Sequence, residues 1–379
     1  MLYHLINDLI AQFKYITFRA SLGAMFAFLL CLILLPRFIA FLKKRKISER
    51  TEKKDSLELV KIHQNKSTTP TMGGVIIISI LLITTLLWAR LDNIFVIYAV
   101  LVTFSLGILG FIDDYLKLNT PHKHGLSKSL KFSGQAIIGL AVGFGLWYYF
   151  THKPPLPENV LNKAREAGLE LIPAGTELYI PLFKTSIELG LLYPFFVALV
   201  IVASSNAVNL TDGLDGLAIG CLVMAALGYS VIVYITGRWD YSGYLRIPYV
   251  PGTGELTIFT AALVGISLGF LWFNSHPAQI FMGDTGALSL GGALGLVAVC
   301  AKQELVLFII GAIFVVEALS VILQVISYRG WGKRIFLIAP LHHHFQFSGM
   351  AESKITIRFW ITAAILALLS LASLKIELF

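Results

Sequence analysis

Ten stretches of mostly apolar residues determine what this chain can fold into, because a helix needs about 20 such residues to cross a lipid bilayer. They lie at residues 20–42, 71–89, 93–112, 132–150, 187–205, 216–236, 255–273, 286–301, 304–328 and 356–376. Hydrophobic residues make up 56% of the chain and charged residues only 14%, against about 25% in a soluble domain. The pattern predicts an all-α polytopic membrane protein in which residues 1–379 form a single integral-membrane domain. We expect the ninth stretch to bend.

The lysines and arginines between the stretches predict which loops face the cytoplasm, since cytoplasmic loops carry the excess of these residues. The loop 43–70 alone holds nine of them, and the loops on its side of the membrane hold 17 against 11 on the other side. We therefore place this loop in the cytoplasm and both termini outside, because the number of spans is even. The net charge of +8 then belongs to the loops and gives no reason to expect nucleic-acid binding.

The cysteines and the outer loops show no pattern that predicts a catalytic or metal-binding site. Cys31, Cys221 and Cys300 lie far apart in apolar stretches, which predicts neither a disulfide nor a zinc site. The outer segment 151–186 is punctuated by prolines and predicts a short hairpin with about one helical turn. Every polar cluster instead falls on the cytoplasmic side, namely STTPTMGG, DDYLK, NAVNLTDGLDG, NSHPAQIFMGDTG and APLHHHF. We therefore expect the chemistry at that face.

Two adjacent aspartates end the third apolar stretch, in the sequence FIDDYLK. On a helix, Asp113 and Lys117 share a face because they are four residues apart, whereas Asp114 is turned by about 100°. Magnesium is usually held by one or two carboxylates plus substrate phosphates, and a nearby lysine can neutralise phosphate. The alternative is a charged helix end that anchors the span at the membrane interface.

Further acids and amides occur in two other cytoplasmic clusters. GDTG places Asp284 beside glycines, which either let the backbone approach a ligand closely or form a tight turn that caps the next helix. NAVNLTDGLDG has no basic residue, and its acids and amides are Asn206, Asn209, Asp212 and Asp215. These side chains suit recognition of a nucleoside or support of a metal ion, although the aspartates could simply cap the following helix.

Three other features have both a structural and a functional interpretation. Lys66 immediately precedes STTPTMGG and Thr71 lies within it, at a helix start where backbone N–H groups can bind an anion. The three histidines of PLHHHF diverge too much on a helix for a three-histidine zinc site, but two of them could reach a phosphate or a base, unless the segment is a solvated loop. They are His342, His343 and His344. Glu317 is the one acid deep inside an apolar stretch, and it is either functional or hydrogen-bonded to a neighbouring helix.

The common placement of these clusters is more informative than any one of them. Acids, amides and basic groups at one membrane face favour a magnesium-dependent site for a phosphorylated, water-borne substrate beside a lipid substrate. A secondary transporter is the alternative class, but transporters place their sites near the midplane and are often built from repeats. This sequence shows no repeat, and Glu317 alone lies deep in the membrane.

The motifs together resemble the phospho-N-acetylmuramoyl-pentapeptide transferases, a branch of the polyprenyl-phosphate N-acetylhexosamine-1-phosphate transferase superfamily. The resemblance covers essentially the whole chain and rests on TPTMGG, FIDDYLK, NAVNLTDGLDG, FMGDTG and GKRIFLIAPLHHHF. DDxxK and NLTDGLDG are typical of the superfamily, whereas TPTMGG and PLHHHF point to this branch. The resemblance implies ten transmembrane helices with both termini outside the cytoplasm.

The resemblance also implies a reaction in a bacterial cytoplasmic membrane. UDP-MurNAc-pentapeptide donates phospho-MurNAc-pentapeptide to undecaprenyl phosphate, which yields lipid I and UMP in the first membrane step of peptidoglycan synthesis. By resemblance, Asp284 binds Mg²⁺, and Asp113, Asp114 and Lys117 lie near the phosphates. The implied substrate-binding residues are Lys66, Thr71, Lys131, Asn206, Asn209, Asp212, Asp215, Asn274, Phe281, His342, His343 and His344.

Several points stay open in the sequence. A transferase for another UDP-N-acetylhexosamine is an alternative within the same superfamily. The third residue of the pentapeptide and the oligomeric state, a homodimer included, are not determined. Because Asp113 has a cation beside it, which lowers the basicity of a carboxylate, we expect the lipid phosphate to attack directly rather than through an aspartyl-phosphate.

Overall fold

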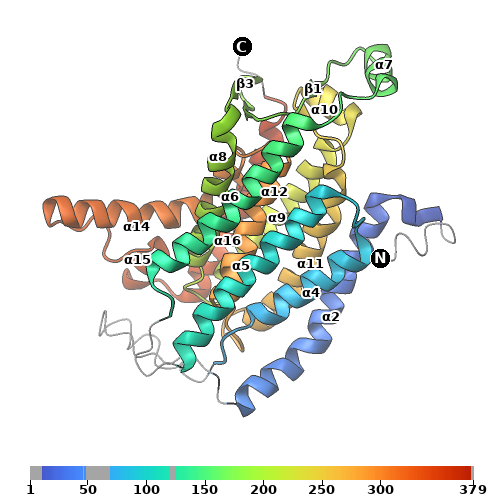
Figure 1. Cartoon of the computed structure of the whole chain (residues 1–379). Helices are drawn as coiled ribbons and strands as arrows, with labels where there is room; N and C mark the ends of the chain where they lie inside the picture. The colour runs from blue at the N-terminus through green and yellow to red at the C-terminus, as the bar shows by residue number, and fades with distance from the viewer. Residues whose placement is uncertain (1–10, 46, 48–68, 120–124, 377–379) are drawn as a thin grey trace.

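The computed structural model describes residues 11–45, 47, 69–119 and 125–376. The helices are η1 (Ala11–Lys14), α2 (Ile16–Lys44), α4 (Gly74–Trp88), α5 (Ile94–Asn119), α6 (Lys128–His152), α7 (Glu158–Glu166), η3 (Gly190–Leu192), α8 (Tyr193–Thr211), α9 (Leu217–Thr236), α10 (Trp239–Leu245), η4 (Thr253–Glu255), α11 (Leu256–Asn274), α12 (Gly283–Cys300), α13 (Leu307–Ile310), α14 (Ala312–Trp331), α15 (Leu341–Phe347) and α16 (Glu352–Ser373). The long helices form one bundle, with α12 in its interior (Figure 1).

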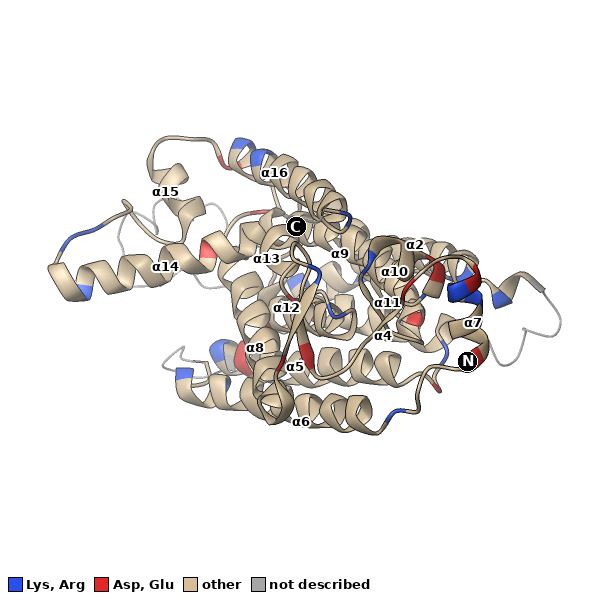
Figure 2. Cartoon of the chain, turned by 90° about the horizontal axis from the view of Figure 1, so that it is seen from above, with Lys and Arg blue, Asp and Glu red and all other residues tan. Residues whose placement is uncertain are grey.

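The predicted all-α polytopic architecture is confirmed. Among the described residues, nine helices are long and apolar enough to cross a membrane. Each of the ten predicted stretches is largely helical, but α4 has only 15 residues, or about 22 Å of rise, and is shorter than a full span. Charged positions are few and lie mainly at helix ends and in loops (Figure 2). The chain is therefore a multi-pass membrane protein.

The ninth predicted stretch is broken, as expected. It forms the short α13 and the longer α14, with Gly311 between them. The amide of Gly311 still donates to the Leu307 carbonyl, at 2.9 Å, so the chain turns there without losing that hydrogen bond. Beyond the break, α14 projects sideways from the bundle at a steep angle to α6 and α12 (Figure 1).

Helix α12 forms the centre of the bundle because its small residues let other helices approach its backbone. Sixteen of its 18 residues are buried. A Cβ atom added to Gly74 on α4 would lie 2.6 Å from the Cα atom of Gly286, and one added to Gly110 on α5 would lie 2.6 Å from the Cα atom of Thr285. Glycines of the TMGG and GDTG motifs therefore serve close helix packing. That packing sets the start of α12 against the charged end of α5.

The outer segment 151–186 contains the predicted hairpin. Strands β2 (Glu177–Ile180) and β3 (Thr185–Glu188) pair antiparallel, and α7 is longer than the single turn expected. Strands β1 (Ile172–Pro173) and β4 (Pro248–Tyr249) pair in parallel. These elements gather with α10 at one end of the bundle, near the C-terminus (Figure 1). The three cysteines are buried and free, as predicted.

Candidate active site

Three aspartates from two helices meet where α5 packs against the start of α12. Asp113 and Asp114 are buried, and each of the three side chains offers an oxygen within 4.8 Å of those of the other two. They come together because Gly110, one turn before Asp113, lets the backbone of Asp284 approach α5. The structure thus unites the two acidic motifs, which are separated by about 170 residues in sequence.

Two lysines neutralise much of this acidic cluster. Lys117 Nζ lies 2.8 Å from Asp113 Oδ2 and 2.6 Å from Asp284 Oδ2. Lys131 Nζ, from the first turn of α6, lies 2.8 Å from the same Asp284 oxygen. The other Asp284 oxygen accepts a hydrogen bond of 2.7 Å from Asn209 Nδ2 on α8. Four helices therefore supply groups that meet at Asp284.

Asp114 is turned toward the N-terminus of α12, where backbone N–H groups have no partner within the helix. Its Oδ2 accepts from the amide and the hydroxyl of Thr285, at 2.9 and 2.7 Å, and its Oδ1 accepts from the Asp284 amide at 3.2 Å. Asp114 therefore acts as the cap of α12 from a neighbouring helix. This contact fixes the backbone that carries Asp284.

Asp113 faces the loop before α6. Its Oδ1 accepts a hydrogen bond of 2.6 Å from the Leu126 amide, and the backbone of Gly125 passes close to the same oxygen. Its Oδ2 faces Lys117. The side chain of Lys117 is 44% exposed, whereas that of Asp113 is only 2% exposed. The site is therefore open to solvent on the lysine side and closed behind the aspartates.

The TMGG segment lies beside the acidic cluster. The Phe281 amide donates to the Pro70 carbonyl, and the Gly73 amide donates back to the Phe281 carbonyl, both at 2.8 Å. This pairing places Thr71 next to Gly283, whose φ of +75° requires a conformation that glycine adopts easily. Phe281 is partly buried. Lys66 lies outside the described residues.

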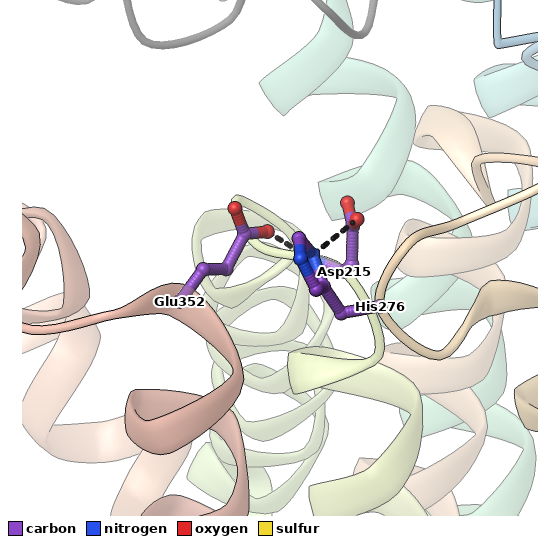
Figure 3. Close-up of side chains that lie close together, drawn as sticks. All are labelled: Asp215, His276 and Glu352. Carbon is purple, nitrogen blue, oxygen red and sulfur yellow. Dashed lines mark hydrogen bonds and ion pairs between the residues drawn. The ribbon is translucent and has the colours of Figure 1, made fainter.

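Two other residues expected in the nucleotide pocket, Asp215 and Asn274, hold two loops together. They are only 3% and 4% exposed. Asp215 Oδ2 accepts from His276 Nδ1 at 3.1 Å and from the Ala278 amide at 3.0 Å (Figure 3). Asn274 Oδ1 accepts from the Gly216 amide at 3.1 Å. Direct contact of either side chain with a nucleotide stays a prediction.

The amides and acids of NAVNLTDGLDG face different ways. Asn209 reaches Asp284, but Asn206 donates to Gln135 on α6 and to the Val202 carbonyl, both at 2.8 Å. The structure thus engages Asn206 with α6 rather than with the aspartates. Asp212 follows α8 as its C-cap residue and is partly buried.

The three histidines lie on the short helix α15 rather than in a solvated loop. His342 is fully buried, and its amide and Nδ1 both approach Glu317, with Nδ1 3.1 Å from Oε2. Of the two interpretations of Glu317, the structure therefore bears out hydrogen bonding to a neighbouring element. The His342 ring packs against Gly213, the last residue of NLTDG. His343 and His344 are partly buried.

Comparison with known proteins identifies the family of the chain. The sequence model described as "Glycosyl transferase family 4" matches residues 96–302. A phospho-N-acetylmuramoyl-pentapeptide-transferase of Geobacter sp. (strain M21) is 48% identical over 100% of both chains. That of Ruegeria pomeroyi is 47% identical over 98% of this chain and 97% of its own. The chain belongs to the phospho-N-acetylmuramoyl-pentapeptide-transferase family. The predicted resemblance is thereby confirmed.

The family match extends over the charged cluster and beyond it. Residues 96–302 include the three aspartates and both lysines, but not Thr71 or the histidines of α15. The relatives that match over the full length extend the similarity to those segments.

Sequence reasoning missed two residues that the fold brings to Asp215. His276 is two residues beyond Asn274 in NSHPAQ, and its proximity to that motif was the only local signal. Glu352 begins α16 and its Oε1 accepts a hydrogen bond of 2.9 Å from the Asp215 amide. Nothing in its sequence neighbourhood predicts this contact, because the two residues are 137 positions apart.

Proposed function

We propose that this protein transfers phospho-MurNAc-pentapeptide from UDP-MurNAc-pentapeptide to undecaprenyl phosphate, with lipid I and UMP as products. The observation that carries the proposal is the convergence of three aspartates and two lysines from α5, α6 and α12 within a multi-pass membrane bundle. Phosphoryl transfer needs positioning and charge neutralisation more than covalent chemistry from the protein. The whole of residues 1–379 would then act as one transferase domain.

The donor atoms of this cluster suit a magnesium ion. All three candidate ligands are carboxylates, and hard oxygen ligands are those that Mg²⁺ prefers. Both oxygens of Asp114 accept hydrogen bonds from backbone amides at the start of α12, which cannot move aside. The oxygens of Asp284 are held by side chains, which can be displaced, so Asp284, with Asp113 beside it, is the better ligand. When bound, Mg²⁺ would supply positive charge that stabilises the transferring pyrophosphate.

Lys117 and Lys131 are also proposed to bind the phosphate groups of the substrate. Lys117 and Lys131 both contact Asp284 Oδ2, so any cation that takes this oxygen competes with them. Once displaced, either ammonium group would be available to a phosphate oxygen of the substrate. Lys117, with its half-exposed side chain, is the better placed of the two to meet a substrate that arrives from water.

Direct attack by the lipid phosphate fits the surroundings of Asp113. Its Oδ1 is held by the Leu126 amide and its Oδ2 faces the Lys117 ammonium. The lipid phosphate is already largely ionised at neutral pH, because its second pKa is about 6, so it needs no covalent relay through Asp113. We therefore propose that Asp113 orients Lys117 through their ion pair and does not attack phosphorus.

The nucleotide is proposed to lie on the α8 and α11 side of the aspartates. Phe281, which is partly buried, would offer its ring to the uracil, and Thr71 lies on the segment that pairs with it, while Asp212 follows α8. His343 and His344, on α15, would lie at the rim. His342, Asn274 and Asp215 would act by holding the surrounding loops, because all three are buried.

The site is proposed to face the cytoplasm of a bacterial cell, with both termini on the other side of the cytoplasmic membrane. The lysine and arginine bias of the loops supports this orientation, because it is strongest in loop 43–70. The donor substrate carries a nucleotide and charged groups, so it would reach the aspartates from water. The acceptor, a lipid phosphate, would reach them from the membrane.

The test is an assay of UMP release by purified full-length protein in detergent with undecaprenyl phosphate. We expect turnover with UDP-MurNAc-pentapeptide, little with UDP-N-acetylglucosamine, and loss of turnover with EDTA that Mg²⁺ restores. Preference for UDP-N-acetylglucosamine would assign the chain to a different sugar. Uptake of a solute into vesicles without UMP release would instead favour a transporter.

A further inference from the structure

A second cluster of potential metal ligands lies apart from the three aspartates. It consists of Asp215, from the turn before α9, His276, from the segment before α12, and Glu352, from the first turn of α16. The three side chains point toward one another, and one ligand atom of each lies within 4.8 Å of the other two (Figure 3). Its donor set, one imidazole nitrogen and two carboxylates, differs from the all-carboxylate set around Asp284.

The spacing of two of these groups already matches that of ligands to one ion. Bonds from Zn²⁺ to nitrogen or oxygen are about 2.1 Å, so neighbouring ligands are about 3.0 Å apart at a right angle and about 3.4 Å apart at a tetrahedral angle. His276 Nδ1 and Asp215 Oδ2 are 3.1 Å apart. Coordination at Nδ1 needs only the neutral tautomer with its proton on Nε2, so the imidazole loses no net proton.

The surroundings hold Asp215 rigidly and leave His276 accessible to solvent. Asp215 is buried, and the Ala278 amide fixes its Oδ2 with a hydrogen bond of 3.0 Å, as supporting groups do around bound metals. The side chain of His276 is 43% exposed, so an ion can enter from solvent. Glu352 is partly buried at the N-terminus of α16 and has a side chain long enough to close on the ion by the remaining distance of about 1–2 Å.

We propose that Asp215, His276 and Glu352 form a binding site for a divalent transition-metal ion of the Zn²⁺ or Co²⁺ type. An imidazole ligand favours such ions over Mg²⁺, which prefers oxygen ligands alone. The all-carboxylate cluster would therefore select Mg²⁺, and the cluster with His276 would select the transition-metal ion. The ion would tie α16 to the loops before α9 and α12, and those loops carry Asp212 and Phe281. It would thus stabilise the positions of the two loops that are proposed to contact the nucleotide.

The experiment uses full-length protein, stripped of metal by a chelator and then kept in millimolar Mg²⁺, so that the all-carboxylate cluster is not available to the probe ion. Binding of Zn²⁺ is measured by calorimetry, and Co²⁺ is added separately because its visible absorption reports nitrogen and oxygen ligation. We expect one equivalent to bind and to raise the midpoint of thermal unfolding by about 5 °C at saturation. His276→Asn should weaken binding at least about 100-fold, and Glu352→Gln about 10-fold.

Both substitutions preserve shape and hydrogen bonding, since asparagine can still donate to Asp215 and glutamine can still accept from its amide. The matched controls are His152→Asn, an exposed histidine on α6, and His344→Asn on α15, which should bind the ion as the wild type does. If His276→Asn does not fold, Glu352→Gln carries the test. The proposal is overturned if the wild type binds no Zn²⁺ in the presence of Mg²⁺, if both cluster variants bind it normally, or if a control variant abolishes binding.

Discussion

Gly110→Ala should displace Asp284, the proposed metal ligand, without altering any charged side chain. A Cβ atom at this position would lie 2.6 Å from the Cα atom of Thr285 and would also clash with the carbonyl oxygen of Asp284. Because carbon atoms pack at about 3.5–4.0 Å, α5 and α12 must separate by about 1 Å. The obstruction is backbone, so a change of side-chain rotamer cannot relieve it.

The expected loss follows from that displacement. A misplacement of about 1 Å in a catalytic constellation can cost about 100-fold in rate, and overpacking of a buried contact typically costs about 1–3 kcal/mol of stability. Gly107→Ala is the matched control, because it lies one turn earlier on α5 and its Cβ would meet only the tip of Ile78, at 2.7 Å. Both substitutions gain the same helix propensity, about 1 kcal/mol.

The assay is UMP release per folded protein, with the folded fraction measured by size-exclusion chromatography and thermal unfolding in the same detergent. Gly110→Ala should lose about 100-fold in rate, whereas Gly107→Ala should stay within a few-fold of wild type. Equal rates for the two variants would refute the idea that close packing at Gly110 positions Asp284.

Three other substitutions address separate parts of the account. Asp114→Asn weakens the charged cap of α12 and should lower the rate about 10- to 100-fold, since a hydrogen bond to a charged group contributes about 1.5–3 kcal/mol; a near-normal rate would show that the cap is dispensable. Phe281→Ala should raise the KM for the UDP-linked donor and weaken uridine-containing inhibitors about 10-fold, and unchanged values for both would make Phe281 a packing residue. Protein freed of polyprenyl phosphate should not exchange labelled UMP into the UDP-linked donor, and mass spectrometry must show that no lipid remains. If exchange does occur without the acceptor, and Asp113→Asn abolishes it, Asp113 is the nucleophile.

The sequence predicted the bundle well because a membrane imposes a simple constraint. Each apolar stretch had to become a helix. A bend was expected in the ninth stretch because it contains Glu317, but the chain breaks at Gly311 instead. The i and i+4 spacing also predicted correctly that Lys117 would reach Asp113, since this contact depends only on local helix geometry.

The contacts between distant segments could not be predicted in this way. No local pattern shows that Asp114 caps α12, that Asn206 turns toward Gln135, or that His342 lies beneath Gly213. Each of these depends on which helix faces which, and therefore on packing around the small residues of α12. The glycines of TMGG and GDTG illustrate the point, because the sequence suggested ligand approach, a tight turn or a helix start for them, whereas the close packing of Gly74 against Gly286 appears only in the structure.

The most direct test of the account is the rate of Asp284→Asn. The substitution keeps the size of the side chain and removes the charge that Lys117, Lys131 and Asn209 surround. Asp240→Asn, which alters an exposed pair with Arg238 outside the cluster, is the matched control. We predict that Asp284→Asn loses at least about 100-fold in UMP release, equivalent to about 2.7 kcal/mol of transition-state stabilisation, while the yield of folded protein and the rate of Asp240→Asn stay near wild type. A rate for Asp284→Asn close to wild type would contradict the assignment of this cluster as the catalytic centre.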